Sequence, residues 1–495
     1  MVTGVKQSQQ TTEKAVERQR KAQLGQFFTP PAIADFMASL FTPGSTNCCR
    51  LLDAGAGVGA LSAAFLERWI SGGFNFQRVE LDAFEIDQTL HSSLAQTLAA
   101  YQQHPDFAPT IHPNDFIPAA ADWLSGNLFA TALPKYTHAI LNPPYKKIRS
   151  DSPHRLALRQ AGIETVNLYS AFVALALALL GEGGQLVAII PRSFCNGPYY
   201  RPFRELVLGQ AAIRHIHLFE SRTQAFKDDA VLQENIIIRL ERGCSQGPVT
   251  VSTSTDDTLA DLATHQYPFA QIVLPGDPER FIHVPTSPDR DVLTTATVVQ
   301  HSVADLGIKV STGPVIDFRV KPYLRAMPEA DTVPLIYPMH CVDGSTVWPV
   351  PNAKKPNAIQ RHIDTDKWLY ASGFYCVVRR FSSKEERRRI TAWVVDPATF
   401  GDAPMLGFEN HLNVFHINRG GLPQPLAHGL ALFLNTTAVD NHFRRFNGHT
   451  QVNATDLRLI KYPSLAILTK LGEWAMHQPK LTQDLIDRQF KAEIA

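Results

Sequence analysis

The 495-residue sequence lacks the features that mark secreted, disulfide-stabilised or membrane proteins. Its six cysteines show no CxxC pair and no paired spacing, which argues against a disulfide framework and a metal site of the zinc type. The amino terminus has no apolar segment of the kind that secretion requires. The longest apolar stretch, 168–180, is too short to span a bilayer. We therefore expect a cytoplasmic protein with no membrane segment and no bound metal.

The sequence also lacks an excess of charge of either sign. Its net charge is only +1, so any surface for a polyanion must be a local patch. Hydrophobic residues make up 44% and charged residues 19%, as in soluble globular proteins. A chain of this length exceeds one ordinary core, which indicates two or three domains.

Short apolar runs alternate with longer helical patterns between about residues 48 and 245. The expected strands are 50–53, 79–85, 109–113, 137–141, 185–190, 213–218 and 234–240. The expected helices between them include 61–70, 88–101 and 167–180. This alternation predicts an α/β fold with a doubly wound, mostly parallel, Rossmann-like sheet and helices on both faces.

The texture changes after about residue 245, where prolines and scattered aromatics replace the βα rhythm. Residues 242–248 contain two glycines and a proline and are the best boundary candidate. We expect a polar arm or helix at 1–23, an α/β domain at 24–245, a second mixed α/β domain at 246–480 and a helical tail at 481–495.

The tetrapeptide Asn142-Pro143-Pro144-Tyr145 follows an expected strand and is the most informative motif. Each proline fixes φ and lacks an N–H donor, so the turn is a rigid platform of acceptors. The side-chain oxygen of Asn142 and the carbonyl of Pro143 suit the two hydrogens of an exocyclic amine, and the Tyr145 ring suits a planar partner. The alternative is a proline-rich turn in which Tyr145 only packs.

Three earlier strand ends carry residues that suit a nucleotide-like ligand. Asp53-Ala54-Gly55-Ala56-Gly57 is a glycine-rich turn between a strand and a helix, which allows close approach to the backbone. Glu85 closes the next strand, where a ribose diol would bind, and Asp115-Phe116 follow the third. Asp115 suits an adenine amine and Phe116 its face. Each motif alone is weak, but their order predicts an adenosyl pocket beside the Asn-Pro-Pro-Tyr turn.

Together these motifs resemble the gamma-class N6-adenine DNA methyltransferases of restriction-modification systems, over residues 24–240. The segment 25–31, which contains Thr29, resembles the family's extra cofactor motif, and 53–57, Glu85 and Asp115-Phe116 resemble its contacts to S-adenosylmethionine. Segments 167–169 and 183–186 match later scaffold motifs. The resemblance implies a Rossmann-like catalytic domain that uses S-adenosylmethionine, with double-stranded DNA as substrate and a separate restriction endonuclease as partner. We favour a monomer.

The resemblance also implies a chemistry. Binding both N–H groups of adenine N6 at Asn142 and Pro143 would localise the nitrogen lone pair for direct methyl transfer, with the proton lost afterward. The base would be flipped out of the duplex at a cost of roughly a few kcal/mol, which stacking at roughly 1–3 kcal/mol per ring would offset. Tyr145 is one ring, and Phe226 falls where the family places the second, although Phe219 competes for this role.

The carboxyl-terminal half is expected to recognise the DNA sequence. Its cations and amides suit phosphates and base edges. The candidate DNA-binding residues are Arg379, Arg380, Arg444, Arg445, Asn447 and Gln451. For the neighbouring cluster at 384–389, a solvated charged face is an equally good explanation.

Other functions stay open on sequence grounds. Cytosine N4 offers the same kind of amine as adenine N6. Protein-glutamine and RNA methyltransferases use the same turn, but they resemble shorter chains without the element at 25–31. A binding module without catalysis is disfavoured by the intact Asn142, Tyr145 and Asp53.

Overall fold

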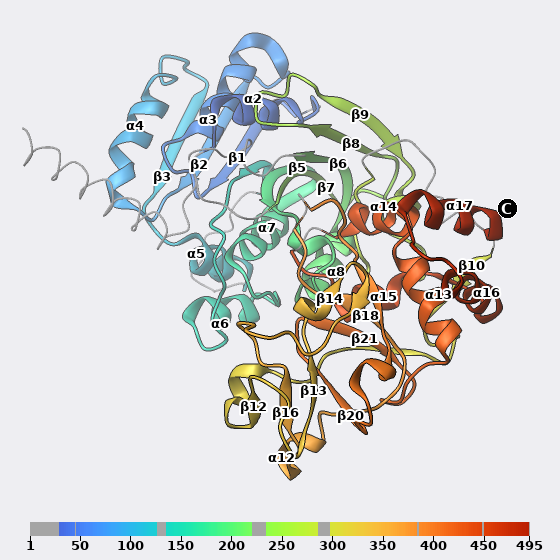
Figure 1. Cartoon of the computed structure of the whole chain (residues 1–495). Coiled ribbons are helices and arrows are strands. Elements are labelled where there is room, and N and C mark those ends of the chain that lie inside the picture. The colour runs from blue at the N-terminus through green and yellow to red at the C-terminus, as the bar shows by residue number, and fades with distance from the viewer. Residues whose placement is uncertain are drawn as a thin grey trace, which may run out of the picture. The chain divides into compact units, whose positions relative to one another are not determined.

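The computed structural model describes residues 29–44, 46–125, 135–219, 234–285, 298–383, 386–447 and 450–494. The chain divides into two compact units, Met1–Pro288 (unit 1) and Asp289–Ala495 (unit 2), and each is described by itself (Figure 1). The expected polar arm at 1–23 and Phe226 lie outside the described residues. None of the helices in the described ranges is long and apolar enough to cross a membrane.

Unit 1 is built on a nine-stranded sheet. The strands from β3 to β5 are mutually parallel, whereas β7 and β9 run antiparallel to their neighbours. In order across the sheet the strands are β3 (Phe107–His112), β2 (Arg78–Phe84), β1 (Cys48–Ala54), β4 (Tyr136–Leu141), β5 (Leu180–Pro191), β7 (Asn235–Arg242), β6 (Ala211–Phe219), β8 (Val249–Ser254) and β9 (Ala263–Tyr267).

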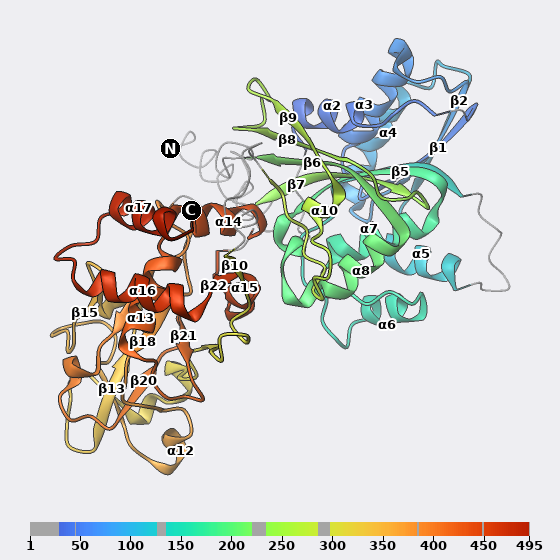
Figure 2. The same cartoon turned by 90° about the vertical axis from the view of Figure 1, so that its right-hand side faces the viewer.

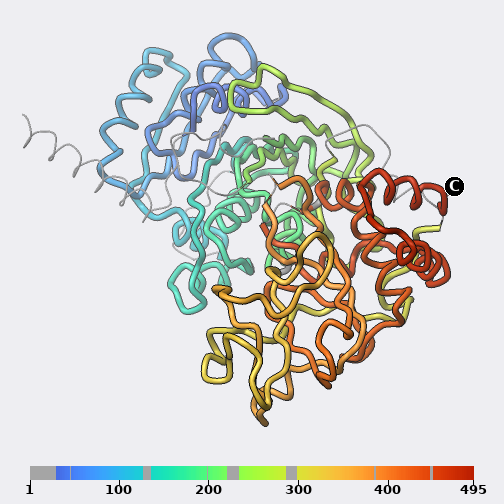
Figure 3. The backbone as a smooth tube through the Cα atoms, in the orientation of Figure 1, coloured from blue at the N-terminus to red at the C-terminus, as the bar shows by residue number. Residues whose placement is uncertain are grey.

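Helices cover both faces of this sheet, as the βα alternation predicts. Successive residues of one strand serve opposite faces: Leu51 packs with one group of helices and Leu52 with the other. The first group is α2 (Pro31–Ser39), α3 (Ala60–Arg68) and α4 (His91–Ala99). The second is α5 (Phe116–Leu124), α6 (Pro153–Gln160), α7 (Leu168–Leu179) and α8 (Arg201–Gln210). Burial on both faces explains why the central strands are continuously apolar, and the architecture is a doubly wound, Rossmann-like α/β fold (Figure 3).

The boundary between the units lies later in the chain than the expected position at 245. β8 begins at Val249 and pairs in parallel with β6, and β9 pairs with β8. The sheet therefore continues past the Gly- and Pro-containing segment 242–248, which connects two strands of one sheet. After β9, the short helix α10 (Phe269–Ile272) and an extended segment complete unit 1.

Unit 2 combines small sheets with a group of helices (Figure 2). Its main sheets have the strand orders β11-β21-β18-β19 and β12-β16-β13-β20-β17, and β10-β22 and β14-β15 form two-stranded ones. The strands are β10 (Val299–His301), β11 (Lys309–Thr312), β12 (Leu324–Arg325), β13 (Thr332–Ile336), β14 (Cys341–Val342), β15 (Ser345–Thr346), β16 (Ala358–Gln360), β17 (Tyr370–Ala371), β18 (Tyr375–Arg379), β19 (Ala392–Val395), β20 (Met405–Phe408), β21 (Leu412–His416) and β22 (Tyr462–Pro463). The helices are α12 (Ile363–Asp366), α13 (Gln424–Leu434), α14 (Thr437–Phe446), α15 (Ala454–Leu459), α16 (Leu465–Met476) and α17 (Gln483–Ile494).

The expected tail at 481–495 forms part of unit 2. Its helix α17 buries Ile486 and Phe490, and the Phe490 ring lies 5.5 Å from that of Phe433 in α13. An amphipathic helix with this apolar face is stabilised by packing, so it does not stand apart as a polar tail.

Helices α13 and α16 approach each other through two glycines. A Cβ atom at Gly472 would lie 1.7 Å from the carbonyl oxygen of Pro425, and one at Gly429 would lie 1.8 Å from that of Leu468. These contacts are to backbone atoms, which cannot rotate away. The helix pair therefore requires glycine at both positions.

We predict that Gly472→Ala destabilises unit 2 by roughly 1–3 kcal/mol, because the added methyl group overpacks the helix crossing. Gly209→Ala in α8 is the control, since no atom lies within 4 Å of its added Cβ and alanine favours a helix by about 1 kcal/mol over glycine. Urea unfolding of both variants measures the difference. Equal stability of Gly472→Ala and the wild-type protein would contradict the close crossing.

Candidate functional site

The carboxyl ends of the central strands lie level with one another. The pairing register joins Ala54 to Phe84 and Phe84 to His112 at the ends of β1, β2 and β3. β4 pairs in parallel with β1 and ends at Leu141. The segments that follow these strands therefore meet at one edge of the sheet, where doubly wound folds bind their ligands.

The glycine-rich turn touches the Asn-Pro-Pro-Tyr turn. Gly55, Gly57 and Gly59 all have positive φ angles, of 81°, 59° and 85°. A Cβ atom at Gly55 would lie 3.9 Å from the carbonyl oxygen of Asn142. The motifs at the ends of two separate strands therefore lie against each other and form one site.

Asp53 is fully buried at the base of this turn. Its Oδ2 accepts a 2.6 Å hydrogen bond from Ser62 Oγ, whereas Oδ1 has no hydrogen-bond partner among the described residues. Burial, together with the nearby Glu85 charge, raises the pKa of the Asp53 carboxyl to about 7. A buried acceptor of this kind suits a ligand that brings a donor or a positive charge.

Glu85 holds the site together through the backbone. Its carboxylate accepts hydrogen bonds from the amide nitrogens of Gly57 at 2.8 Å and Asp87 at 2.7 Å, and the side chain is buried. The carboxylate thus joins the turn after β1 to the turn after β2.

Asp115 and Phe116 are more engaged with the protein than the sequence indicates. Asp115 caps α5 by accepting from Ile117 N at 3.0 Å, and its Oδ2 lies 2.6 Å from His154 Nε2. The hydrogen bond to Asp115 raises the pKa of His154. Phe116 is only 2% exposed and packs edge-on against Phe84, which leaves little of its ring for a ligand.

The Asn142 side chain is oriented from both ends of its amide. Its Nδ2 donates to Thr29 Oγ1 at 2.9 Å, and its Oδ1 accepts from the Tyr145 hydroxyl at 3.3 Å. The same hydroxyl also lies 3.1 Å from the Ile189 carbonyl oxygen, and burial raises the pKa of Tyr145. Thr29, expected among the cofactor contacts, therefore positions Asn142 in this structure.

A group of tyrosines behind the turn was not expected from the sequence. The rings of Tyr145 and Tyr169 pack edge-on with centroids 6.2 Å apart. The ring centroid of Tyr200 lies 5.8 Å from that of Tyr169. Tyr169 also lies 3.3 Å from Ser193 Oγ through its hydroxyl. Asn167-Leu168-Tyr169 was singled out as a motif, but only tertiary structure brings its tyrosine to Tyr145.

The candidate DNA-binding residues of unit 2 differ in accessibility. Asn447 requires correction, because it is 1% exposed and its amide binds Arg389 and Asp456 at 2.9 and 3.0 Å. A buried side chain held in this way stabilises the fold and does not reach a duplex.

The candidate arginines are all partly exposed, but two are paired with acids. Arg379 is paired with Glu386, and Arg444 lies 2.7 Å from Asp440. Arg445 is also partly exposed. Arg380 donates to Gln451 at 3.3 Å, and both side chains are half-buried. Charge pairing of Arg379 and Arg444 within the protein weakens the case for phosphate contacts at these two positions.

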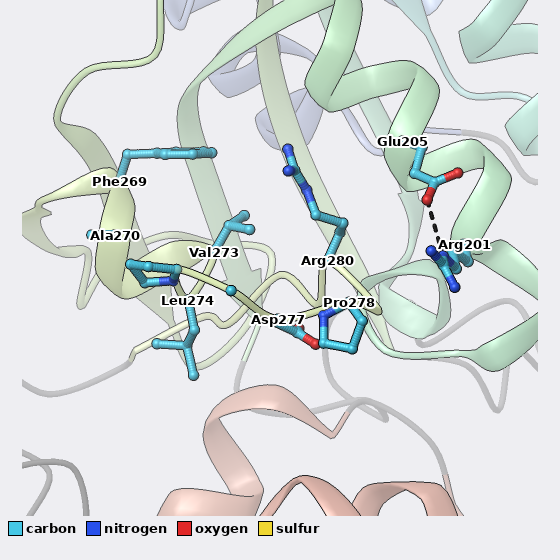
Figure 4. Close-up of a pocket in the computed structure, with 11 residues that line it drawn as sticks. Arg201, Glu205, Phe269, Ala270, Val273, Leu274, Asp277, Pro278 and Arg280 are labelled. Atoms are coloured by element: carbon cyan, nitrogen blue, oxygen red, sulfur yellow. Dashed lines mark hydrogen bonds and ion pairs between the residues drawn. The ribbon is translucent and has the colours of Figure 1, made fainter.

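A cavity of about 470 Å³ lies elsewhere in unit 1, between α8 and the segment after α10 (Figure 4). Arg201 on its wall pairs with Glu205 at 2.9 Å. Asp277 accepts from the backbone nitrogens of Glu279 and Phe281. Arg201, Glu205 and Asp277 are thus engaged within the protein, and the cavity lining includes none of the sequence-predicted site residues.

Comparison with known proteins agrees with this site. Residues 92–226 match the family model described as Eco57I restriction-modification methylase. The Type II methyltransferase M.BsuBI of Bacillus subtilis is 53% identical over 458 residues, which cover 92% of this chain and 91% of that protein. The Type II methyltransferase M.PstI of Providencia stuartii is 43% identical over 451 residues, covering 90% and 88%.

Solved structures resemble the chain more distantly. The type IIG restriction endonuclease BpuSI aligns with a TM-score of 0.45 at 13% identity, covering 94% of this chain and 63% of that one. A complex of DrdV with DNA aligns with a TM-score of 0.47 at 10% identity, covering 92% and 57%. The sequence relatives therefore carry the assignment.

Near-complete coverage at 53% identity, together with the joined glycine-rich and Asn-Pro-Pro-Tyr turns, identifies the function in outline. The chain belongs to the Type II DNA methyltransferases of restriction-modification systems, which use S-adenosylmethionine as methyl donor.

Proposed function

We propose that the protein transfers a methyl group to the exocyclic N6 of an adenine that is flipped out of duplex DNA at a specific sequence. The observation that carries this proposal is the Asn142 amide, which Thr29 holds from its nitrogen end while Gly55 lies against its backbone carbonyl. This arrangement suits a side chain that accepts hydrogen bonds from an amine directly beside the turn that would hold the cofactor.

The residues at the sheet edge fit S-adenosylmethionine. Asp53 Oδ1 is a buried acceptor with no hydrogen-bond partner among the described residues, which suits the cationic methionine end. The positive φ angles of Gly55 and Gly57 allow close approach to the backbone. Glu85 and Asp115 are carboxylates at the ends of β2 and β3, where they suit the ribose and the adenine amine, respectively. Bound S-adenosylmethionine supplies the electrophilic methyl group.

Asn142 and Pro143 activate the target amine. An adenine N6 is a poor nucleophile, because its lone pair is delocalised into the ring. Accepting one hydrogen at Asn142 Oδ1 and the other at the Pro143 carbonyl favours a tetrahedral nitrogen with a localised lone pair. In the orientation that the structure shows, Asn142 Nδ2 donates to Thr29, which leaves the amide oxygen to accept from the amine.

The position of this turn supports the proposal that the base is flipped out. An amine inside a duplex cannot reach acceptors at the edge of a sheet, so extrusion costs roughly a few kcal/mol. Stacking on Tyr145 contributes roughly 1–3 kcal/mol toward this cost. The ring of Tyr145 is fixed by its hydroxyl contact to Ile189 O and its edge contact to Tyr169. Phe226 remains our proposal for a second ring.

We further propose a division of labour between the units. Unit 1 carries the transfer chemistry, and unit 2 recognises the DNA sequence, with Arg380 and Gln451 as the retained candidates for base contacts and Arg445 as a phosphate contact; Arg379 and Arg444 are paired with Glu386 and Asp440. A monomer acting apart from its restriction endonuclease satisfies this scheme.

Asn142→Ala is expected to reduce methylation of duplex DNA by on the order of 10²–10³-fold or more, the scale for loss of one polar group aimed at a reacting centre. Thr29→Val, which removes the acceptor that orients the amide, should reduce turnover by about tenfold. Single-turnover methyl transfer measures both effects. S-adenosylmethionine affinity should change little in Asn142→Ala, and unchanged turnover in this variant would contradict the mechanism.

The pKa of about 7 at Asp53 predicts pH-dependent cofactor binding. Below pH 7 the carboxyl is neutral and attracts the cationic end of the cofactor less, whereas above pH 7 it is ionised. Affinity for S-adenosylmethionine should therefore rise between pH 6 and 8, as calorimetric titration would show. Asp53→Asn should bind weakly with no such pH dependence. A wild-type affinity that stays constant across this range would exclude the role of Asp53.

A further inference from the structure

We propose that Arg380, Phe381, His411 and Gln451 form a base-reading cluster, which contacts base edges in the major groove of the DNA target. The inference rests on the proposed action at a specific DNA sequence and names the residues that provide the specificity. His411 and Phe381 were not among the residues that the sequence singled out for DNA contact.

Three segments of unit 2 meet at Arg380. Its backbone nitrogen donates to His411 O at 2.8 Å, and its carbonyl oxygen accepts from Val452 N at 2.7 Å. The neighbouring Phe381 forms an isolated bridge with Gln451. The end of β18, the turn between β20 and β21, and the segment before α15 are thus joined by backbone hydrogen bonds. Side chains on such a junction are held in position before a ligand arrives.

His411 is oriented by a buried acid. Glu409 is fully buried, and its carboxylate accepts from His411 Nδ1 at 2.5 Å and from His411 N at 2.9 Å. The His411 side chain is nevertheless 42% exposed. The hydrogen bond at Nδ1 leaves Nε2 on the other side of the ring, and Nε2 has no hydrogen-bond partner within the described ranges. A buried carboxylate that fixes an exposed imidazole is typical of a side chain prepared for a specific contact.

Phe381 lies between His411 and Arg380. Its ring is 4.8 Å from the His411 ring, and the Arg380 guanidinium lies 5.8 Å from its centroid. Phe381 is 40% exposed although its ring contacts both the His411 ring and the Arg380 guanidinium. An exposed apolar face flanked by two hydrogen-bonding groups matches a thymine methyl between polar base edges.

Arg380 and Gln451 hold each other in place. The Arg380 guanidinium donates to Asn410 O at 3.1 Å and to Gln451 Oε1 at 3.3 Å. Because Gln451 accepts through its oxygen, its amide nitrogen faces elsewhere. Arginine reads guanine O6 and N7, and glutamine reads adenine N6 and N7, so these two side chains supply the commonest direct contacts in the major groove.

A second charged group lies close to the base-reading cluster. Asp317 interacts electrostatically with His411, and its carboxylate binds Lys355 Nζ at 2.5 Å. The Asp317–Lys355 pair carries no net charge, so the Arg380 guanidinium is the cation that borders the aromatic and amide groups of the cluster. A duplex is a polyanion, so such groups bordered by arginine favour DNA over a protein partner.

The test compares His411→Ala and Phe381→Ala with His362→Ala. His362 is a matched control, because it is a histidine of similar exposure that also lies beside an acid. Its side chain is 45% exposed with Nδ1 3.2 Å from Asp364 Oδ2, and that of His411 is 42% exposed beside Glu409. Each full-length variant is assayed for kcat/KM on its cognate duplex. The methylated sites in DNA from cells expressing each variant are mapped by sequencing of modified bases, and thermal unfolding and S-adenosylmethionine affinity are measured in parallel.

We expect His411→Ala and Phe381→Ala to lower kcat/KM on the cognate duplex by about 10- to 100-fold. Both variants should methylate sites that differ from the cognate sequence at one position, with wild-type cofactor affinity and unchanged salt dependence of binding. His362→Ala should behave as the wild-type protein. A purely structural role would change the thermal stability of the variants without relaxing the sequence specificity of methylation.

Three results would overturn the inference. One is a cognate site spectrum and rate in His411→Ala and Phe381→Ala that match those of His362→Ala. Another is an equal loss on every duplex with a shallower salt dependence, which indicates phosphate contacts instead of base reading. The third is unfolding that accounts for all lost activity. If the wild-type protein methylates a specific site in these experiments, the proposed function stands even where the inference fails.

Discussion

The orientation of one amide is the constraint on which the active site depends. In the proposed mechanism, Asn142 presents its oxygen to a substrate amine, whereas a primary amide rotated by half a turn would present two donors instead. In the structure, Thr29 Oγ1 accepts from the amide nitrogen at 2.9 Å, and the amide oxygen lies on the other side of the amide. Thr29 itself is buried and lies directly before α2, whose Ile33 and Met37 pack into the sheet core. The packing of one helix therefore sets the chemistry at a turn more than one hundred residues away.

On the side of the site proposed for the cofactor, a single side chain likewise holds more than one turn. Glu85 binds the amide nitrogens of Gly57 and Asp87, so one carboxylate fixes two turns at the strand ends. Asp53 takes one hydrogen bond from Ser62 and keeps its second oxygen without a hydrogen-bond partner in the described part of the chain. The pKa of the Asp53 carboxyl is raised to about 7, so its neutral form is available near physiological pH. The folded protein therefore tolerates this buried acceptor. A cationic ligand would then stabilise the charged form.

Much of unit 1 could be predicted from the sequence, since its information is local. The expected strand 79–85 corresponds to β2 at Arg78–Phe84, and the expected helix 167–180 to α7 at Leu168–Leu179. Apolar runs bounded by glycine and acid residues determine these elements. The contacts of Asn142 with Thr29, and of Asp115 with His154, join residues 113 and 39 positions apart. No local pattern encodes such pairs, so only the tertiary structure brings them together.

Unit 2 was predicted less well, for a related physical reason. Asn447 and Arg444 occur in a segment rich in cations and amides, a composition that suits DNA contacts and internal hydrogen-bond networks equally. Contacts within the protein decide between the two: Asn447 is buried and binds Arg389 and Asp456, and the partly exposed Arg444 is paired with Asp440. His411, by contrast, stands in no basic cluster, and only its contact with the buried Glu409 distinguishes it.

The identity of the methylated nucleoside tests the central claim most directly. Duplex DNA incubated with the purified protein and S-adenosylmethionine would be digested to nucleosides and analysed by mass spectrometry. The account predicts N6-methyladenine as the product, absent when Asn142 is replaced by alanine. N4-methylcytosine in its place, or methylated protein with unmodified DNA, would contradict it.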